Sequence, residues 1–522
     1  MKSYSRGNII TAKIISEEQM KNKKNFFEKA AWLLGGMVLW YMAGGDQPVG
    51  LAVWMAPALI LRCFRDMGPF RGFLIILPSL VLVEIFSDKG MVPFPSFKMI
   101  LIYTGIGMVF TLIPYLIDSL IRKRLPKWMK LLFFPSLAIA IPFLLKANGA
   151  WGARANGIDD LAFLQLVSVT GMSGISFVIY WTATLLNEAW EHRKRMNEIK
   201  FQILAFAMVL ILIYGFGTAR LRTSGEGTDF IQAAGVVHDA DLRKELMNGY
   251  QRLLSVKPGD ETALSDVRVS MKGLFNRFLS KSLSLGDAGA ELAVWGEGSA
   301  LIFEEDEEEL INLAARAAKE KKIMIGIGVA VLQKNDKPED GQISPLFRNK
   351  LILVSSEGEI VWEYSKGILV PGMEEAITIP GDKRMKIDKA QQMITGAICY
   401  ELDFPRYIRQ ASHLKAGLIL GPSNDWKEIK NIHSRMARLR AIETGVSLFR
   451  PTNGGISVAV DPFGRILSSV DHDRYPGSHI IATLPTESVF TIYGLFGDFF
   501  GWLCLFLLAL SIISLLVQKF KK

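Results

Sequence analysis

Long apolar runs divide this chain into a hydrophobic part and a polar part. Hydrophobic residues make up 50% of the 522 positions, and many gather in runs close to the roughly 20 residues with which a helix crosses a bilayer. The runs cover about 27–44, 48–64, 72–87, 97–120, 131–147, 161–187 and 200–218, then about 488–518. The sequence therefore predicts seven membrane spans at 25–218, a polar insert at 219–487 and an eighth span at 488–518.

The basic residues of the connecting loops predict how these spans are oriented. Positive charge occurs in the N-terminal arm 1–24 and then in every second loop, at Lys21, Lys23, Lys24; Arg62, Arg65, Arg71; Arg122, Lys123, Arg124, Lys127, Lys130; and Arg193, Lys194, Arg195, Lys200. Loops rich in Lys and Arg stay in the cytoplasm, so the arm and the tail 519–522 are expected inside. Seven crossings then place 219–487 on the extracytoplasmic side of the cytoplasmic membrane.

Charge and cysteine content exclude several functions. The formal net charge is +9, but the basic residues bunch in short loops instead of lining one aromatic-studded face, so no nucleic-acid partner is expected. Three scattered cysteines are too few for a disulfide framework. Charges are scarce within the spans, which argues against a transporter. No metal-ligand spacing and no phosphate-binding glycine loop occurs, so we expect no metal and no cofactor.

The insert alternates β-branched apolar runs with helical patterns. Helices are predicted at about 259–281, 305–320, 404–414 and 430–444, with strands between them. This alternation predicts an α/β domain whose sheet is buried between helices. Functional groups of such a domain are expected at the ends of strands.

Three polar residues follow predicted strands of the insert. Glu297 closes "ELAVWGE", Lys366 follows "EIVWEYS" and Cys399 closes "MITGAIC". A thiol attacks as a thiolate and needs a base and a positive charge nearby, which a carboxylate and an ammonium supply. The ammonium and the backbone N–H of Tyr400 could also stabilise an oxyanion. Position alone leaves open that Cys399 is a small buried apolar residue and that the two charges are solvated.

A Cys–His pair is the alternative arrangement for the same thiol. His413 and His433 could each pair with Cys399, but both lie in helical patterns with charged neighbours, where we expect exposed side chains. On the second of these helices Arg435, Arg438 and Arg440 recur on one face. They could meet phosphate headgroups, or form a solvated or salt-bridged face.

Four motifs of the insert resemble the nitrilase, or carbon–nitrogen hydrolase, superfamily, and they occur in the family's order. They are "VWGE" with Glu297, "YSKGILVPGMEE" with Lys366 and Glu374, "GAICYELDFP" with Cys399, Tyr400 and Glu401, and the segment from "GPSNDW" to "NGGISVAVDPFGRI". The resemblance implies a four-layer α-β-β-α sandwich. It implies a triad in which Glu297 is the general base, Lys366 positions the groups and stabilises the oxyanion, and Cys399 is the nucleophile.

The resemblance extends to supporting residues and to one branch of the superfamily. Glu374 matches the family's second glutamate, and Tyr400 and Glu401 follow the nucleophile. The spans, "SNDW" and the helix from His433 to Glu443 resemble the apolipoprotein N-acyltransferase branch. That branch moves an acyl chain from a phospholipid, through a cysteine thioester, to the α-amino group of the lipidated N-terminal cysteine of an apolipoprotein.

The substrate-binding residues and the oligomeric state are further expectations. Trp295, Asn424 and Trp426 are candidates for contact with substrate. The alternative for each tryptophan is core packing, and for Asn424 it is a turn. We expect the chain to act as a monomer.

Two departures from the branch leave a second function open. Gly296 stands where the branch has proline. The motif "LVPGMEE" is closer in sequence to the soluble hydrolases, and the loop between it and Cys399 is shorter than in the branch. The alternative is therefore a membrane-tethered amidase that hydrolyses a C–N amide bond with water as the second nucleophile. A non-catalytic scaffold is a third reading, and the complete triad argues against it.

Overall fold

The computed structural model describes residues 26–92, 96–145, 154–223, 229–256, 260–333, 346–387 and 393–520. The chain divides into two compact units. The first contains Met1–Lys146, Ser176–Val209 and Gly501–Lys522, and the second contains Ala147–Ile175 and Leu210–Phe500. The predicted arm 1–24 lies outside the described residues.

Apolar helices build the first unit. A helix covers 26–43, and the others are α2 (Gly50–Met67), α3 (Pro69–Ser87), α4 (Phe97–Ile121), the short turn η1 (Arg122–Arg124), α5 (Lys127–Leu144), most of α8 (Met172–Glu191), η3 (Met196–Glu198), the first part of α9 (Lys200–Arg222) and α17 (Phe499–Phe520). Four of them, α3, α4 with η1, α9 and α17, are long and apolar enough to cross a membrane, and a bent pair that includes α8 could make a fifth. These helices indicate a membrane protein; the predicted count of eight spans stays a prediction.

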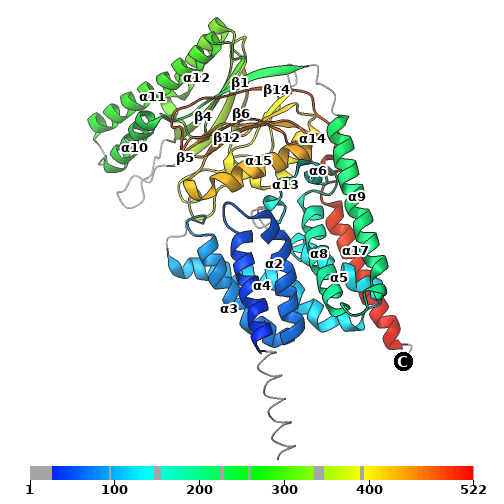
Figure 1. The fold of residues 1–522 in the computed structure, drawn as a ribbon. Helices are drawn as coiled ribbons and strands as arrows, with labels where there is room; N and C mark the ends of the chain where they lie inside the picture. Colours follow the sequence, from blue (N-terminus) through cyan, green and yellow to red (C-terminus); the bar gives the residue numbers. More distant parts are fainter. Residues whose placement is uncertain are drawn as a thin grey trace, which may run out of the picture. The chain divides into compact units, whose positions relative to one another are not determined.

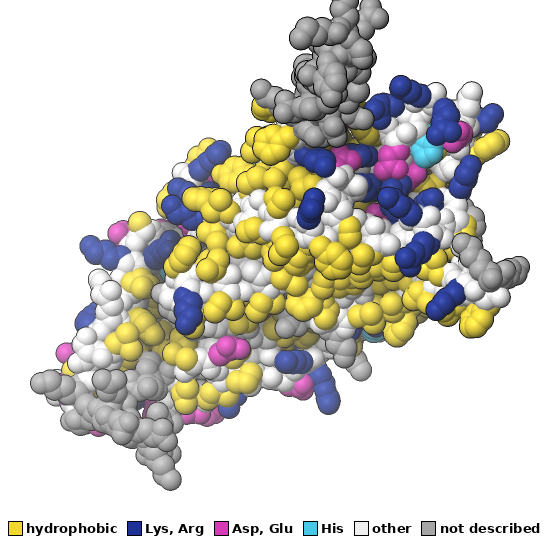
Figure 2. All heavy atoms as spheres, turned by 90° about the horizontal axis from the view of Figure 1, so that it is seen from below, with side chains coloured by type: hydrophobic (Ala, Val, Ile, Leu, Met, Phe, Trp, Pro, Cys, Tyr) yellow, Lys and Arg dark blue, Asp and Glu magenta, His cyan; other side chains and the backbone are white. Residues whose placement is uncertain are grey.

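The surfaces of these helices carry large apolar side chains. Leu74 on α3 and Phe201 on α9 are each 73% exposed. On the face drawn in Figure 2, hydrophobic side chains cover broad areas between scattered Lys and Arg. Proteins that live in water rarely expose apolar areas of this extent, so the natural surroundings of these helices are lipid chains.

Two predicted spans are interrupted in the structure. The run 161–187 is divided into α6 (Leu161–Leu164), α7 (Val167–Thr170) and α8, and the chain bends by 115° where α8 begins. The run 488–518 begins with the short helix α16 (Ile492–Phe496) before α17. Both breaks have a glycine with a left-handed backbone, Gly171 (φ 62°) and Gly497 (φ 63°). Glycine adopts this conformation without a Cβ clash, and it ends a helix because the chain turns away there.

A buried ion network ties α2, α4 and α8 together within the first unit. Arg65 Nε lies 3.6 Å from Asp118 Oδ2, and its Nη1 lies 3.5 Å from Glu188 Oε1. Arg122 pairs with Glu188 and, at 2.9 Å, with Glu191. The sequence interpretation assigned Arg65 to a loop, whereas the structure places it within α2. Charges in such surroundings persist because they are paired with one another.

Two β-sheets form the centre of the second unit. One has seven strands in the order β14-β1-β2-β4-β5-β6, with β3 beside β4, and the other has five in the order β13-β12-β10-β8-β7. Their bounds are β1 (Phe230–Val236), β2 (Leu292–Trp295), β3 (Ala300–Phe303), β4 (Met324–Leu332), β5 (Phe347–Val354), β6 (Ile360–Ser365), β7 (Ile394–Gly396), β8 (Leu418–Leu420), β10 (Ser447–Arg450), β12 (Ile456–Val460), β13 (Ile466–Asp471) and β14 (Ile480–Pro485). A separate pair joins β9 (Ser423–Asn424) to β11 (Thr452–Asn453).

Helices cover the outer faces of both sheets (Figure 1). On the seven-stranded sheet they are α10 (Ala240–Ser255), α11 (Glu261–Asp287) and α12 (Glu304–Lys321); on the five-stranded sheet they are α13 (Pro405–Ile408), α14 (Gln410–His413) and α15 (Lys430–Thr444). Successive side chains of β2 point to opposite faces of the sheet and pack in different layers. Leu292 and Val294 face the core between the sheets, whereas Ala293 and Trp295 face the helices. The predicted α-β-β-α sandwich is confirmed.

Candidate active site

The strand directions bring Glu297 and Lys366 to one edge of the seven-stranded sheet. β2 is parallel to β4, and β4 and β6 are each antiparallel to β5, so β2, β4 and β6 run the same way. Glu297 lies two residues beyond β2, and Lys366 follows β6 directly. In the other sheet, Cys399 lies just beyond β7. The prediction that these three residues follow strands is confirmed.

Lys366 is held between two carboxylates. Its Nζ donates to Glu297 Oε1 and to Glu374 Oε1, both at 2.8 Å. The Lys366 side chain is 1% exposed; burial alone would lower its pKa, but the negative charges of Glu297 and Glu374 outweigh this and raise it. Glu374 is fixed in turn, because its Oε2 accepts the N–H of Val370 at 2.7 Å. The lysine is therefore a fixed ammonium.

Cys399 occupies a sharp turn at the start of the short 3-10 helix η5 (Cys399–Asp403). Its φ is 48°, a left-handed conformation that costs a non-glycine residue about 1–2 kcal/mol. Its N–H donates to Pro422 O at 2.9 Å. The residue is 6% exposed, and burial, with the charge of Glu297, raises the pKa of the thiol well above its usual value, while Lys366 opposes this. The resting thiol is therefore protonated and needs a base.

Glu401 joins the segment after Lys366 to the residue before Cys399. Its Oε1 accepts the N–H groups of Gly367 (2.7 Å) and Ile368 (3.1 Å), and its Oε2 accepts the N–H of Ile398 (2.7 Å). The Tyr364 hydroxyl also donates to it. Burial raises the pKa of the Glu401 carboxyl to about 7, although these donors lower it. Glu401 thus acts as a clamp within the fold.

Tyr400, next to the nucleophile, places its ring edge-on against Phe404, with 5.0 Å between ring centres. The side chain is only partly buried. The role of its backbone N–H in stabilising an oxyanion stays a prediction.

Two asparagines that the sequence interpretation missed hold the loop of Glu297. Asn349 Nδ2, on β5, donates to Glu297 Oε1 at 2.8 Å. Asn453 Nδ2, on β11, donates to the backbone oxygen of Glu297 at 2.9 Å. Both asparagines are far from Glu297 in sequence, so no local spacing could reveal them.

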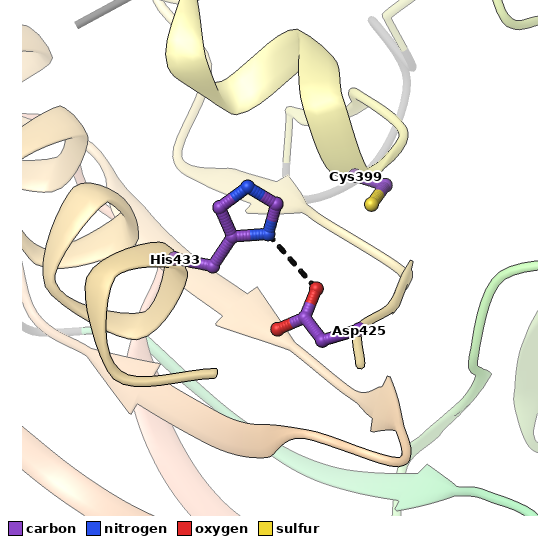
Figure 3. A group of neighbouring side chains, drawn as sticks. All are labelled: Cys399, Asp425 and His433. Atoms are coloured by element: carbon purple, nitrogen blue, oxygen red, sulfur yellow. Dashed lines mark hydrogen bonds and ion pairs between the residues drawn. The ribbon is translucent and has the colours of Figure 1, made fainter. Parts of the chain in front are cut away.

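His433 is buried beside Cys399, so the expectation of an exposed side chain was wrong; His413 is exposed as predicted. The Nδ1 of His433 lies 2.9 Å from Asp425 Oδ1, and the Nε2 of His433 lies 3.2 Å from Asp403 Oδ2. Burial lowers the pKa of the imidazole, but these two carboxylates outweigh it and raise it to about 9. Figure 3 shows the ring turned toward Asp425, with Cys399 near both.

The grouping of Cys399, Asp425 and His433 has the residue types of a metal site, with ligand atoms within 4.8 Å of one another. Both ring nitrogens of His433 already contact carboxylates. Arg450 Nη2 donates to both oxygens of Asp425, at 2.9 and 2.8 Å. A metal ion would have to displace a proton from the imidazolium and lie against the guanidinium, so these residues do not fit a metal.

The three predicted substrate contacts lie in different surroundings. Trp295 is 0% exposed, stacks edge-on against Phe275 of α11 and donates its Nε1 to Ser282 at 2.7 Å. It therefore packs the outer core, away from the side of the sheet that faces the five-stranded sheet. Asn424 is exposed and Trp426 is partly buried, and they flank Asp425.

The three arginines of α15 contact the protein itself. Arg435 Nη1 donates to Asn156 O at 2.8 Å, and Arg438 Nε donates to Gly464 O at 2.7 Å. Arg440 pairs with Glu443 at 2.9 Å, fully buried. These contacts agree with the salt-bridged alternative for Arg440 and for Arg435, which also lies 3.6 Å from Asp159.

This chain is similar to proteins of a known family. Residues 270–489 match the profile of the family described as Carbon-nitrogen hydrolase. The chain is 23% identical over 359 residues to the apolipoprotein N-acyltransferase of Rickettsia typhi, covering 64% of this chain and 66% of that protein. It is 22% identical over 435 residues to that of Geobacter metallireducens, covering 77% and 78%. The alignment thus spans about two thirds of the length of the Rickettsia relative.

Solved structures of amidases are similar to part of this chain. An amidase from Nesterenkonia sp. matches 51% of this chain and 95% of its own, with 18% identity and a TM-score of 0.36. The family profile and the relatives show to which proteins this chain is similar. The chain contains a carbon–nitrogen hydrolase domain of the nitrilase superfamily and is similar to the apolipoprotein N-acyltransferases.

Proposed function

We propose that this protein transfers an acyl chain from a membrane phospholipid, through a thioester on Cys399, to the α-amino group of the lipidated N-terminal cysteine of an apolipoprotein. The observation that carries the proposal is the buried Lys366, bonded to Glu297 and Glu374 beside a buried thiol. The helices suited to a membrane and the names of the relatives support lipid substrates.

The first half-reaction forms the thioester. The sulfur of Cys399 attacks the ester carbonyl carbon of the phospholipid while Glu297 takes the thiol proton. The negative oxygen of the tetrahedral intermediate lies against the Lys366 ammonium and the N–H of Tyr400. The C–O bond then breaks, and the leaving alcohol of the lysophospholipid takes the proton from Glu297.

The second half-reaction uses the same groups. The neutral α-amino group of the acceptor attacks the thioester carbonyl carbon and gives a proton to Glu297. The C–S bond breaks, an amide forms, and the thiolate of Cys399 recovers the proton from Glu297. Nothing is consumed beyond the two substrates, and the enzyme returns to its resting state.

A thioester reaches the amine only if water reaches it more slowly. Glu297, Lys366 and Cys399 are all buried, which limits access of bulk water. A membrane anchor brings two lipid substrates to the enzyme by diffusion within the bilayer. We place the catalytic unit on the extracytoplasmic face, where the basic loops of the chain predict it.

The test is the mass of the peptide that contains Cys399. Purified protein is incubated with a phospholipid of defined acyl chain in detergent micelles, digested and weighed by mass spectrometry. The expected result is a mass increase equal to that acyl chain, which hydroxylamine removes and Cys399→Ser abolishes. A matched control, Cys63→Ser with Cys504→Ser, keeps the adduct because these cysteines lie in α2 and α17.

The same purified protein can be tested for the alternative function, hydrolysis of small amides. The shorter loop before Cys399 is the observation that favours hydrolysis. Release of ammonia or amine from small amides, with no lipid-derived adduct on Cys399, would contradict acyl transfer and establish a membrane-tethered amidase.

A further inference from the structure

A network of four charged residues lies beside Cys399. They come from four elements: Asp403 from η5, Asp425 from the residue after β9, His433 from α15 and Arg450 from β10. All four are buried. The ligand atoms of Cys399, Asp425 and His433 lie within 4.8 Å of one another. Figure 3 draws these three side chains.

The charges of this group balance only if His433 is protonated. Asp403 and Asp425 each contribute one negative charge, and Arg450 contributes one positive charge. His433 contacts a carboxylate at each ring nitrogen, at 2.9 and 3.2 Å, and Arg450 Nη2 lies 3.3 Å from its Nδ1; a neutral ring with one N–H could donate to only one of the two carboxylates. The imidazolium therefore supplies the fourth charge.

We propose that His433 is a positioning residue for Cys399: its imidazolium holds the nucleophile turn to the loop after β9 and keeps the charge behind the sulfur balanced when the thiolate forms. The proposal rests on Cys399 being the nucleophile of the proposed function. It assigns no proton transfer to His433. Glu297 remains the base, because both nitrogens of His433 are occupied by carboxylates.

The chemistry of the first step makes this balance matter. When Glu297 takes the proton of Cys399, a negative charge appears on a buried sulfur. Without the imidazolium, two carboxylates and one guanidinium would leave a net negative charge near that sulfur, and like charges disfavour the charged form. The imidazolium therefore favours the thiolate without touching the substrate.

Two variants that break the same contact separate a charge effect from a packing effect. His433→Gln removes the positive charge, whereas Asp403→Asn removes a negative charge at the other end of the 3.2 Å contact. The measurement is the rate at which iodoacetamide alkylates Cys399, followed by the mass of its peptide between pH 6 and 9. In that reaction the thiolate displaces iodide, so the rate reports the thiolate fraction.

The proposal expects opposite changes. Alkylation at pH 6.5 slows about tenfold in His433→Gln, the effect of about one pKa unit on the thiol, and it speeds up in Asp403→Asn. The double variant returns close to the wild-type rate. His413→Gln, an exposed histidine of α14, leaves the rate unchanged.

Equal slowing in both single variants would overturn the proposal, since loss of packing acts in the same direction in both. Unchanged rates in both would overturn it too. If His433→Gln fails to fold, as seen by circular dichroism, Asp403→Asn decides alone: acceleration supports the proposal and slowing contradicts it. Alkylation needs no phospholipid, so a missing acyl adduct with the expected alkylation rates would refute acyl transfer and leave this inference standing.

Discussion

The carboxylate of Glu297 shows how a single residue is prepared for proton transfer. Its Oε1 accepts hydrogen bonds from both Lys366 and Asn349 at 2.8 Å. Two donors on one oxygen restrict the rotation of the carboxylate, and in the proposed mechanism the other oxygen, Oε2, takes the proton of Cys399. A base whose orientation is fixed before the reaction loses little entropy when it acts.

Asn349→Leu should slow thioester formation about 10- to 100-fold, the range of one misplaced catalytic group. The lost N–H lets the carboxylate of Glu297 rotate, although Lys366 still holds it. The measurement is the rate of adduct formation on Cys399 with phospholipid in excess. Asn276→Leu, an exposed residue of α11, is the matched control, and equal rates in both variants would contradict the assignment.

His433 makes stability depend on pH in a stated direction. Its pKa in the folded protein is raised to about 9 from an ordinary 6.5, so the folded state binds a proton that the unfolded state releases between these values. The stabilisation is complete below about pH 6.5 and is lost as the pH rises through 9. The melting temperature of the wild type should therefore fall more steeply over this range than that of His433→Gln. Parallel curves for the two proteins would contradict a charged His433.

The carboxylate of Glu401 joins two loops of the candidate active site. Glu401 binds the N–H groups of Gly367 and Ile368 after β6 and that of Ile398 after β7. These loops carry Lys366 and Cys399 and come from different sheets. The distance between the Lys366 ammonium and the Cys399 sulfur therefore depends on Glu401.

Glu401→Gln should lower stability by about 1–3 kcal/mol, because the amide nitrogen turns a donor toward one of three buried N–H groups. Acylation of Cys399 should slow as well, since the two loops lose their common acceptor. Chemical unfolding followed by tryptophan fluorescence gives the stability. Glu357→Gln, in a turn between β5 and β6, is the control, and a Glu401→Gln protein as stable as this control would refute the clamp.

The sequence could predict the strands of the site but not the surroundings of α15. Glu297, Lys366 and Cys399 end apolar runs that form strands whatever packs on them. α15 is polar, so an exposed face was expected. In the structure it lies between the five-stranded sheet and the segment that contains η2 (Arg154–Gly157) and α7, and its charges are satisfied by distant partners such as Asn156 O and Gly464 O. Such partners leave no local pattern.

The buried pair of Arg440 and Glu443 on α15 tests that explanation. Glu443 Oε1 also accepts the N–H of Met172 at 3.2 Å, and burial raises the pKa of the Glu443 carboxyl to about 7. Arg440→Met should destabilise the protein by about 3–5 kcal/mol by leaving a buried carboxylate without its cation. Adding Glu443→Gln should recover much of this loss. A double variant that is less stable than Arg440→Met would contradict pairing as the reason for the burial.

For the whole molecule, the number of crossings before residue 219 decides which side of the membrane the catalytic unit occupies. In the described residues, α3, α4 and α9 qualify as spans by length and apolarity, and the bent pair Leu161–Thr170 with Met172–Glu191 would add a fourth. The helix 26–43, α2 and α5 would bring the total to seven. Seven crossings and four crossings put the catalytic unit on opposite sides of the membrane. The apolarity of the helices alone therefore does not decide the side, whereas the basic loops favour seven crossings.

Reporter fusions test this parity directly. Alkaline phosphatase, which folds only outside the cytoplasm, is fused after Thr223, and a second fusion is made after Arg124 in the basic loop beyond α4. With seven crossings, the fusion after Thr223 is active and the fusion after Arg124 is inactive, because the loops rich in Lys and Arg remain inside. An inactive fusion after Thr223 would place the catalytic unit in the cytoplasm. Such a result would leave Cys399 on the wrong side for an acceptor exported before its acylation, and the proposed acceptor would have to be abandoned even if the thioester forms.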